Sequence, residues 1–510
     1  MINNQNWLEK KNLALLGGGQ EKIEKQKQLG KLNARERIGL LLDENSFQET
    51  DQLVVAAFSD KKNYTDGVIT GFGKINNQIV AIYSQDFTLN GGSLGKNHAK
   101  KIIKIMDMAA KIGCPIIGLI DSGGARIQEG IHALSGFGDI FFRNTRYSGI
   151  IPQISIILGP CAGGAVYSPA LTDFIFTVEN ISQMFITGPS VIKETLHQDV
   201  TKDELGGASI HNTKSGVAHF LCKNEIECFE KVKKLLYYIP RNYLEQKETL
   251  DNYIEPENNQ ILDQLIPNNP NKSYDIKKVI NTVFDKESFF EIQEFFAQNI
   301  VTGFATLSGK IIGIVANQPM IMAGTIDIDA SEKAAKFIRF CDSFSIPIIT
   351  LVDVPGFLPG IDQEHNGIIR RGAKLLYAYA EATVPKITLI LRKAFGGAYI
   401  VMGSKQLGAD FNFAFPNAQI AVLGANAAIS ILHEKTLKSE PNIEIRNQKH
   451  SNLLENYATE FLTPYIAAEY GYIDAIIDPN ETRNKLISAL LICENKVEKL
   501  PAKKHGNIPL

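Results

Sequence analysis

The sequence contains few cysteines and histidines, and neither residue type is clustered. The 510-residue chain has six cysteines, none of them in a Cys-x-x-Cys pair, and most lie among apolar residues. This pattern favours reduced cysteines buried in a core over redox or metal-binding ones. The nine histidines form no HxxxH or Cys/His cluster. No metal site is therefore expected, because zinc sites gather several such ligands at short spacings.

A charge excess and long apolar runs are also absent. The formal net charge is −2, so neither a nucleic-acid backbone nor an anionic membrane surface would attract the chain. No run of 18 apolar residues occurs, and residues 1–31 are polar and lysine-rich, without the apolar stretch of a signal peptide. We therefore expect a cytoplasmic protein, with no nucleic acid and no membrane among its partners.

The chain does contain an internal duplication, since residues 68–189 and 300–425 present the same features in the same order. The matching features are residues 43–49 with 285–291, 70–72 with 302–304, Asp121 with Asp353, and 163–165 with 396–398, at offsets of 242, 232, 232 and 233 residues. Strand-like and helix-like patterns alternate through both copies, which is typical of α/β folds with parallel strands. The sequence thus predicts two tandem α/β domains, residues 1–255 and 270–510.

Three other segments carry weaker patterns. Residues 20–43 mix charged and apolar residues at helical spacing and predict one exposed amphipathic helix. Arg35, Glu36 and Arg37 are then expected on its solvated face, with a functional contact as the alternative. Six Asn and three Pro between Asp251 and Lys272 predict a linker. The charged stretch beyond Asp478 is expected to be peripheral.

The first candidate site is the turn that follows an apolar strand ending in Asp121. Its residues are Ser122, Gly123, Gly124, Ala125 and Arg126. Glycines permit a sharp turn with positive φ, and the helix that follows presents N–H groups and a partial positive charge. Such a turn can hold a phosphate or a thioester oxygen, with Arg126 available to the phosphate. A merely tight corner is the alternative.

A second turn follows one strand later and recurs in the other copy. Gly163 and Gly164 lie among small residues that leave the backbone amides uncovered, and Gly396, Gly397 and Ala398 repeat this arrangement. Backbone N–H groups placed in this way can stabilise an oxyanion. Two tandem sites suggest two reacting partners.

In the second copy, the place of the first turn is taken by Pro355, Gly356 and Phe357. This loop has no counterpart of Arg126, so phosphate binding is less favoured there. Its aromatic and proline residues instead predict a rigid apolar wall, suited to an uncharged bicyclic or acyl group.

A competing motif surrounds Ser93. Residues 91–95 fit G-x-S-x-G, the pattern of a hydrolase nucleophile. However, a loop separates the preceding strand from Ser93 where that motif needs a sharp turn, and no histidine can be assigned to the serine from the sequence. We therefore interpret Ser93 as part of a glycine-rich loop that contacts a ligand.

Long stretches of the sequence resemble the carboxyltransferase β subunit of biotin-dependent acyl-CoA carboxylases, the propionyl-CoA and acetyl-CoA carboxylase group. They are KLNARERIGLLLD (31–43), SQDFTLNGGSLG (84–95), GCPIIGLIDSGGARIQEG (113–130), GPCAGGAVYSPALTDF (159–174), LVDVPGFLPG (351–360), GAKLLYAYAEATVPKITLILRKAFGGAY (372–399) and KHGNIPL (504–510). The resemblance covers nearly the whole chain. It implies two crotonase/ClpP-like domains, each a ββα superhelix, in a homohexamer with shared active sites.

The resemblance also implies a division of labour. Acyl-CoA would dock on residues 1–255, and carboxybiotin, delivered by a biotin carboxylase/biotin carboxyl carrier α subunit, would dock on residues 270–510. Gly163 and Gly164 would hold the thioester enolate, while Gly397 and Ala398 would hold the ureido oxygen of biotin. The enolate would then attack CO2 released from carboxybiotin, a reaction that needs orientation and electrostatics more than acid–base side chains.

Some positions depart from the family pattern. Ile400 follows GGAY where propionyl-specific relatives often carry Asp, and an apolar residue there also resembles acetyl-CoA enzymes and decarboxylases. Ile400 is expected near the acyl pocket, and the acyl chain, the carrier and the direction of the reaction stay open. Two alternatives remain: the α subunit of a biotin-dependent decarboxylase, and a non-catalytic scaffold of the same fold.

Overall fold

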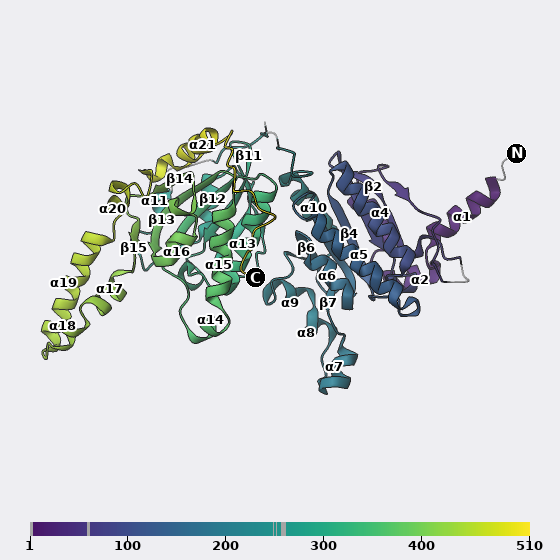
Figure 1. Cartoon of the computed structure of the whole chain (residues 1–510), viewed down its shortest axis with the longest axis horizontal. Coiled ribbons are helices and arrows are strands. Elements are labelled where there is room, and N and C mark those ends of the chain that lie inside the picture. Colours follow the sequence, from purple (N-terminus) through teal and green to yellow (C-terminus); the bar gives the residue numbers. More distant parts are fainter. Residues whose placement is uncertain (1–3, 59–61, 248, 251, 257–261) are drawn as a thin grey trace. The chain divides into compact units, whose positions relative to one another are not determined.

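The computed structural model describes residues 4–58, 62–247, 249–250, 252–256 and 262–510. The chain divides into two compact units, Met1–Gln246 and Lys247–Leu510 (Figure 1). Each unit has one sheet of eight strands within its described residues, flanked by helices. The units are called unit 1 and unit 2 below.

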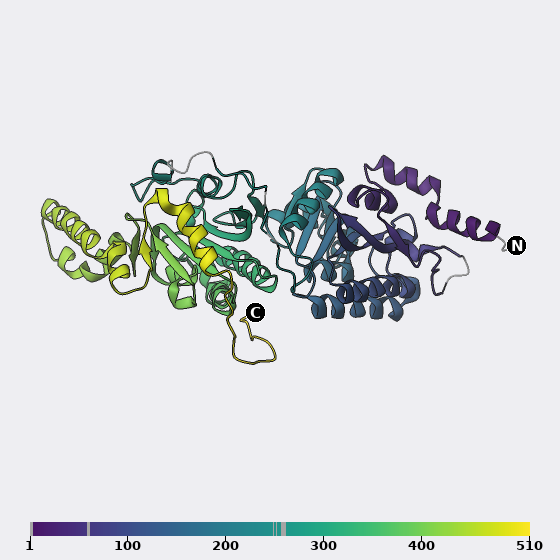
Figure 2. The same cartoon turned by 90° about the horizontal axis from the view of Figure 1, so that it is seen from above.

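In unit 1 the sheet begins antiparallel and continues parallel. In spatial order its strands are β1 (Gln48–Thr50), β2 (Val68–Ile75), β3 (Gln78–Gln85), β4 (Ile116–Ser122), β5 (Gln153–Ala162), β6 (Phe174–Val178) and β8 (Phe220–Cys222), and β7 (Gln183–Phe185) also pairs with β5. All pairings from β3 onward are parallel. Helices α4 (Lys96–Ile112) and α5 (Ile131–Tyr147) bury apolar stripes against one face of this sheet (Figure 2).

Unit 2 repeats this plan. Its strands are β9 (Phe290–Ile292), β10 (Ile300–Leu307), β11 (Lys310–Asn317), β12 (Ile348–Val354), β13 (Lys386–Phe395), β14 (Phe411–Ala414) and β16 (Ala475–Ile476), and β15 (Gln419–Ala421) also pairs with β13. Helices α13 (Ile328–Ser343) and α15 (Ile368–Glu381) pack on each other. Helix α12 (Ile276–Val283) joins the core with its buried Ile276, Val279, Ile280 and Val283.

The duplication extends to individual hydrogen bonds. The Asp43 carboxylate accepts from the N–H groups of Asn76 and Asn77, and the Asp285 carboxylate accepts in the same way from Ser308 and Gly309. A carboxylate that caps two turn amides in this way fixes the hairpin between the first two long strands of each unit.

A buried lysine is also repeated. Lys101 donates to the carbonyls of Thr65 and Val68, at the start of β2. In unit 2, Lys333 donates to the carbonyls of Phe296 and Ile300, both at 2.8 Å, and of Gln293 at 2.9 Å. Both side chains are buried. Each lysine therefore satisfies carbonyls of the loop that leads into a hairpin and of the first residue of the strand that follows.

Two expectations about segments 20–43 and 479–510 are wrong. Residues 20–43 form two helices, α2 (Gln20–Gln28) and α3 (Ala34–Leu41), because Asn33 caps a new helix with its side chain. Arg37 is fully buried rather than solvated. After Asp478, helix α21 (Thr482–Ile492) buries Leu486, Ala489 and Leu490 in the unit 2 core, so this stretch is not peripheral.

The linker expectation is wrong in part. Part of residues 251–272 lies outside the described residues, but the rest includes helix α11 (Leu262–Leu265). Leu262 and Ile266 join the unit 2 core. The many asparagines and prolines predicted a linker, although Leu262 and Ile266 anchor this segment in the core.

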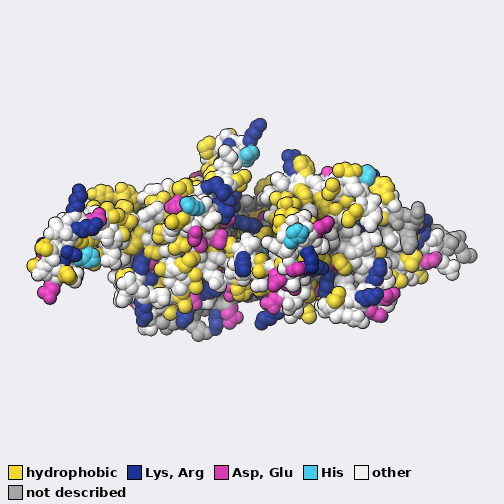
Figure 3. All heavy atoms as spheres, turned by 90° about the horizontal axis from the view of Figure 1, so that it is seen from below, with side chains coloured by type: hydrophobic (Ala, Val, Ile, Leu, Met, Phe, Trp, Pro, Cys, Tyr) yellow, Lys and Arg dark blue, Asp and Glu magenta, His cyan; other side chains and the backbone are white. Residues whose placement is uncertain are grey.

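The expectation about cysteine agrees with the structure. All six cysteines are free and buried. Acidic and basic side chains are interspersed over the face drawn in Figure 3. In the described part of the chain, every helix is too short or too polar to cross a membrane.

Replacement of Lys333 by methionine tests the role of the buried lysine. Lys333→Met keeps the length of the side chain but leaves the Gln293, Phe296 and Ile300 carbonyls without this donor. An unsatisfied buried carbonyl costs about 1–3 kcal/mol, so we expect a loss of at least about 2 kcal/mol in the free energy of unfolding. Denaturant unfolding checks this, with Lys336→Met on the exposed side of the same helix as the control. Equal stability of the two variants would refute the role.

Candidate active site

The predicted residues of unit 1 lie at one edge of its sheet. β4 and β5 are parallel neighbours, so the turns that follow them leave the sheet side by side. Gly124, with φ 99°, lies so close to β5 that an added Cβ would come within 2.8 Å of the Ala162 carbonyl oxygen. Gly124 is thus placed where only glycine fits. The structure therefore brings the first and second glycine turns of unit 1 together.

Gly163 and Gly164 begin the 3₁₀ helix η4 (Gly163–Val166), directly after β5. The first N–H groups of a helix have no partner within it. Both glycines are only half-buried, and Gly163 has φ 62°. An added Cβ on Gly164 would meet the Phe137 ring at 3.5 Å, an ordinary contact. These amides are placed where they can donate to an oxyanion.

The loop around Ser93 forms one wall of this site. Leu94 N donates to Gly124 O, and Arg126 N donates to Leu94 O, both at 2.9 Å, so the loop pairs with the first turn like a short strand. The Ser93 hydroxyl donates to the Asn90 carbonyl at 2.7 Å. This bond ties Ser93 to its own loop rather than to a catalytic base.

Arg126 lies behind the first turn and already has partners. Its Nη1 is 2.7 Å from both Asp66 Oδ1 and Glu129 Oε1, and its Nη2 donates to Ser93 O at 2.9 Å. The side chain is 5% exposed. The predicted contact of Arg126 with a phosphate stays untested, whereas its place here is that of a residue that holds the Ser93 loop against the turn.

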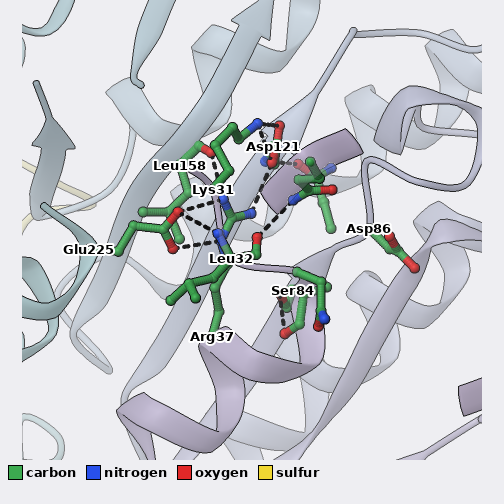
Figure 4. Close-up of polar contacts among 12 residues, drawn as sticks. Lys31, Leu32, Arg37, Ser84, Asp86, Asp121, Leu158 and Glu225 are labelled. Carbon is green, nitrogen blue, oxygen red and sulfur yellow. Dashed lines mark hydrogen bonds and ion pairs between the residues drawn. The ribbon is translucent and has the colours of Figure 1, made fainter. Parts of the chain in front are cut away.

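Asp121 is the centre of a buried charge cluster that sequence reasoning missed (Figure 4). Lys31 and Arg37 both pair with its carboxylate, at 2.7 and 2.9 Å. Arg37 also binds Glu225 through two hydrogen bonds of 2.8 and 2.9 Å and donates to Leu158 O. The string KLNARER contains Lys31 and Arg37, but no feature of the sequence shows that Arg37 reaches Glu225, 188 residues away.

His98 is a neutral histidine in a series of polar contacts that runs from Asp121, before the first turn, to Asp66, which holds Arg126. Asp121 N donates to Gln85 Oε1, and the Gln85 amide nitrogen lies 3.3 Å from His98 Nε2. His98 Nδ1 is 2.9 Å from Asp66 O, which only accepts, so Nδ1 carries the proton. Burial, with Arg126 nearby, lowers the pKa of His98 to about 3. The imidazole is therefore neutral at physiological pH.

Unit 2 builds an equivalent edge from different residues. Pro355, Gly356 and Phe357 follow β12 and are half-buried. Ile326 N donates to Gly356 O, and Leu358 N donates to Ile326 O, which matches the Leu94 bonds of unit 1. The Phe357 ring lies against Gly372, where an added Cβ would approach it to 3.2 Å. Two backbone hydrogen bonds and this contact hold the loop in place, and its role as an apolar wall for a ligand stays a prediction.

Gly396, Gly397 and Ala398 begin helix α16 (Gly396–Val401), directly after β13. Gly396 has φ 59°, close to the 62° of Gly163. Gly397 is exposed, and an added Cβ there would meet no atom within 4 Å, so there is open space beside its amide. Ile400 lies half-buried on the same helix. The second set of predicted residues is therefore together, within unit 2.

The environment of Asp353 resembles that of Asp121. Its carboxylate accepts from Arg392 Nε at 3.0 Å and from Lys393 N at 3.1 Å. Burial raises the pKa of Asp353, while Arg392 opposes that shift. Arg392 lies against the Tyr274 ring, 5.0 Å from its centroid, and also donates to the Lys272 carbonyl.

Comparison with known proteins identifies the family of the chain. Residues 25–508 match the family model of the carboxyl transferase domain. The chain belongs to the carboxyl transferase family. It is 53% identical, over 98% of both chains, to a propionyl-CoA carboxylase carboxyltransferase subunit of Haloferax mediterranei. It is also 51% identical, over 99% of this chain and 98% of the other, to a methylmalonyl-CoA decarboxylase subunit alpha of Propionigenium modestum.

A solved structure supports the same family. The chain superposes on transcarboxylase 12S, a hexamer solved with methylmalonyl-CoA bound, with a TM-score of 0.95, 46% identity and coverage of 99% and 98% of the two chains. The two crotonase-like α/β domains and the carboxyl-transfer activity expected from the sequence are thereby confirmed. The carboxyl transferase is an enzyme, so the non-catalytic scaffold is set aside.

The pKa of His98 predicts a pH dependence of stability. The unfolded chain takes up this proton near the ordinary pKa of 6.5, whereas the folded protein takes it up only near 3. Folding thus binds fewer protons between these values, so stability falls as the pH drops through this window. From pH 7 to pH 5 the loss due to His98 is about 2 kcal/mol.

His98→Asn, which keeps an amide N–H for Asp66 O, removes this titration. We expect the wild-type protein to lose about 2 kcal/mol more stability than the variant between pH 7 and pH 5. Denaturant unfolding at both pH values measures the difference, and parallel losses in the two proteins would contradict the buried neutral state of His98.

Proposed function

We propose that this carboxyl transferase moves a carboxyl group from carboxybiotin on a carrier protein to the α-carbon of a short-chain acyl-CoA, such as propionyl- or acetyl-CoA. The observation that carries the proposal is the pair of matched glycine sites, one in each unit. Each places the first N–H groups of a helix beside an open turn, and each begins with a glycine of similar φ. Two oxyanion sites suit a reaction in which both partners develop negative oxygen.

At the first site, the Gly163 and Gly164 amides would donate to the thioester oxygen of the acyl-CoA. This charge appears only when the α-proton leaves, so donors aimed at it stabilise the transition state more than the substrate. Gly123, Gly124, Ala125 and Ser93 would form the adjoining wall, and Arg126 would keep that wall in place through Ser93 O. Acid–base side chains are not required for these tasks.

At the second site, the Gly397 and Ala398 amides would donate to the ureido oxygen of biotin. The group fits here, because open space lies beside Gly397 while Pro355, Gly356 and Phe357 supply an apolar wall. Carboxybiotin, when bound, supplies the CO2 to be transferred. Gly396 provides the turn that points these amides outward, and Ile400 lies one helical turn further along.

The proposed partners are a biotin carboxylase/biotin carboxyl carrier α subunit, which would bring the carboxybiotin, and further copies of this chain in a homohexamer. Transcarboxylase 12S was solved as a hexamer, which supports the homohexamer. We propose a cytoplasmic site of action and no metal in this subunit; among the described residues, His, Cys, Asp and Glu form no group suited to a metal ion.

A second candidate is the reverse reaction, in which a biotin-dependent decarboxylase takes the carboxyl group from methylmalonyl-CoA. Two relatives named as its α subunit are 51% and 52% identical to this chain, close to the 53% of the carboxylase relative. The same two sites serve both directions, because a catalyst lowers one barrier for forward and reverse reactions alike.

The deciding experiment supplies the purified protein with biotin and a coenzyme A ester and follows transfer of labelled carboxyl in both directions. Transfer between methylmalonyl-CoA and free biotin is expected. The choice between carboxylase and decarboxylase then follows from the partner that copurifies with the chain, because the same sites catalyse both directions. A biotin carboxylase subunit supports the carboxylase, a membrane decarboxylase subunit supports the decarboxylase, and failure to transfer to or from any short-chain ester would overturn the proposal.

Gly164→Val tests the first site. An added Cβ makes an ordinary contact with Phe137, so folding should persist. The branch of valine is expected to cover the adjacent amides. Loss of one oxyanion donor costs roughly 10²–10³ in rate, and we expect at least that loss in kcat for carboxyl transfer. Gly138→Ala, on the exposed side of α5, is the control. Near-normal turnover by a folded Gly164→Val protein would remove this site from the mechanism.

Ile400 tests acyl selection. If it lies near the acyl pocket, its branched apolar side chain limits the room for the α-substituent of the acyl group. One methylene in an apolar pocket is worth about 1–3 kcal/mol. We expect Ile400→Asp to change the ratio of kcat/KM for acetyl-CoA over propionyl-CoA by at least about tenfold, or roughly 1.4 kcal/mol. Ile400→Val is the matched control, and an unchanged ratio in an active Ile400→Asp enzyme would place selection elsewhere.

A further inference from the structure

Both sheets break register at the same point, just before their glycine turns. β4 and β5 pair regularly up to Ile120 with Ile157, and pairing resumes at Ser122 with Cys161. In unit 2 the break lies between the pairs Val352 with Ile390 and Val354 with Ala394. A single residue of one strand therefore faces three residues of the next. In both units that single residue is the buried aspartate, Asp121 or Asp353.

In unit 2 the longer strand itself supplies the donors for this aspartate. Arg392 Nε donates to Asp353 Oδ2, and Lys393 N donates to Asp353 Oδ1, at 3.0 and 3.1 Å. Both residues lie in β13, inside the register break. The carboxylate therefore satisfies a backbone N–H group that the irregular pairing would leave without a strand partner.

In unit 1 the equivalent positions, one repeat earlier, are Gly159 and Pro160, and neither can donate in this way. Glycine has no side chain, and proline has no N–H group. Lys31 Nζ instead donates to Asp121 Oδ1, and Arg37 Nη1 donates to Asp121 Oδ2, both at 2.9 Å. The same two carboxylate oxygens are satisfied from outside the strand (Figure 4).

Gly159 makes room for these outside donors. An added Cβ there would lie 1.9 Å from Asp121 Oδ1 and 2.6 Å from Lys31 Nζ. The backbone N–H of each aspartate is held alike, by Gln85 Oε1 at 3.2 Å in unit 1 and by Asn317 Oδ1 at 3.3 Å in unit 2. The two units therefore use different donors, but both satisfy the two carboxylate oxygens of the buried aspartate.

We infer that Asp121 and Asp353 are matched positioning residues, each of which fixes the register break that sets the second glycine turn of its unit against the first. Asp121 acts on the amides of Gly163 and Gly164, and Asp353 acts on those of Gly397 and Ala398. Neither carboxylate is expected to touch a substrate. The assignment of acyl-CoA to the turn of unit 1 and of biotin to the turn of unit 2 rests on the proposed function.

Asp121→Asn and Asp353→Asn in the full-length chain test the inference, because asparagine keeps the shape but loses the charge that holds the donors. We expect hydrogen exchange to become at least about tenfold faster in residues 159–167 of the first variant and 392–400 of the second, with the other turn unchanged. In the transfer assay with free biotin, kcat should fall at least about fivefold in both variants with little change in KM, because the displaced amides act on charge that develops in the transition state.

Asp43→Asn is the matched control, because it removes a half-buried carboxylate cap from the hairpin of residues 76–77 at the opposite edge of the sheet. It should lower the Tm without changing kcat or the exchange at either turn. If Asp121→Asn fails to fold, Lys31→Met, which removes one donor only, should speed exchange at residues 159–167 alone. An effect on both turns alike, or on neither, would overturn the inference.

Failure of the proposed function can be recognised separately. If the unmodified protein transfers no carboxyl group in either direction, that proposal fails. Exchange at the two turns then decides the positioning inference by itself, since it requires no substrate.

Discussion

The parallel pairing of two neighbouring central strands is the constraint on which both candidate sites depend. Parallel strands end at the same edge of a sheet, and the turns that follow β4 and β5 must leave it next to each other. The same holds for β12 and β13. Each site is consequently a product of backbone topology, and its donors are main-chain amides. The side chains described above, such as Asp121 and Asp353, lie beneath or beside the turns and hold them in place.

The sequence predicted the fold class and the location of both turns because glycine positions and strand patterns are local properties that the duplication shows twice. Gly163 and Gly396 could be found without a partner residue, since positive φ is a requirement of the turn itself. Strand β5 continues through Pro160, because the register break means that no N–H group is needed there.

The buried charges could not be predicted from the sequence. Arg37 lies in a pattern that fits a solvated helix, and its burial depends on Asp121 and Glu225, which are 84 and 188 residues away. Arg126 follows a glycine turn, which favoured a ligand contact, yet Asp66, 60 residues away, holds it from behind. Partners distant in sequence decide whether an arginine faces a ligand or the protein interior, and spacing along the chain does not encode them.

Gly159 and Arg392 occupy equivalent positions in the two units, and this difference has a consequence for substitutions in unit 1. An arginine added at position 159 would force a second guanidinium onto a carboxylate already held by Arg37. Loss of Arg37 first would leave Asp121 and Glu225 with Lys31 as the nearest cation of this cluster. Either single step passes through a destabilised protein. Residues 37, 159 and 160 are therefore coupled, because a change at one of them alone disturbs the contacts of the same carboxylate.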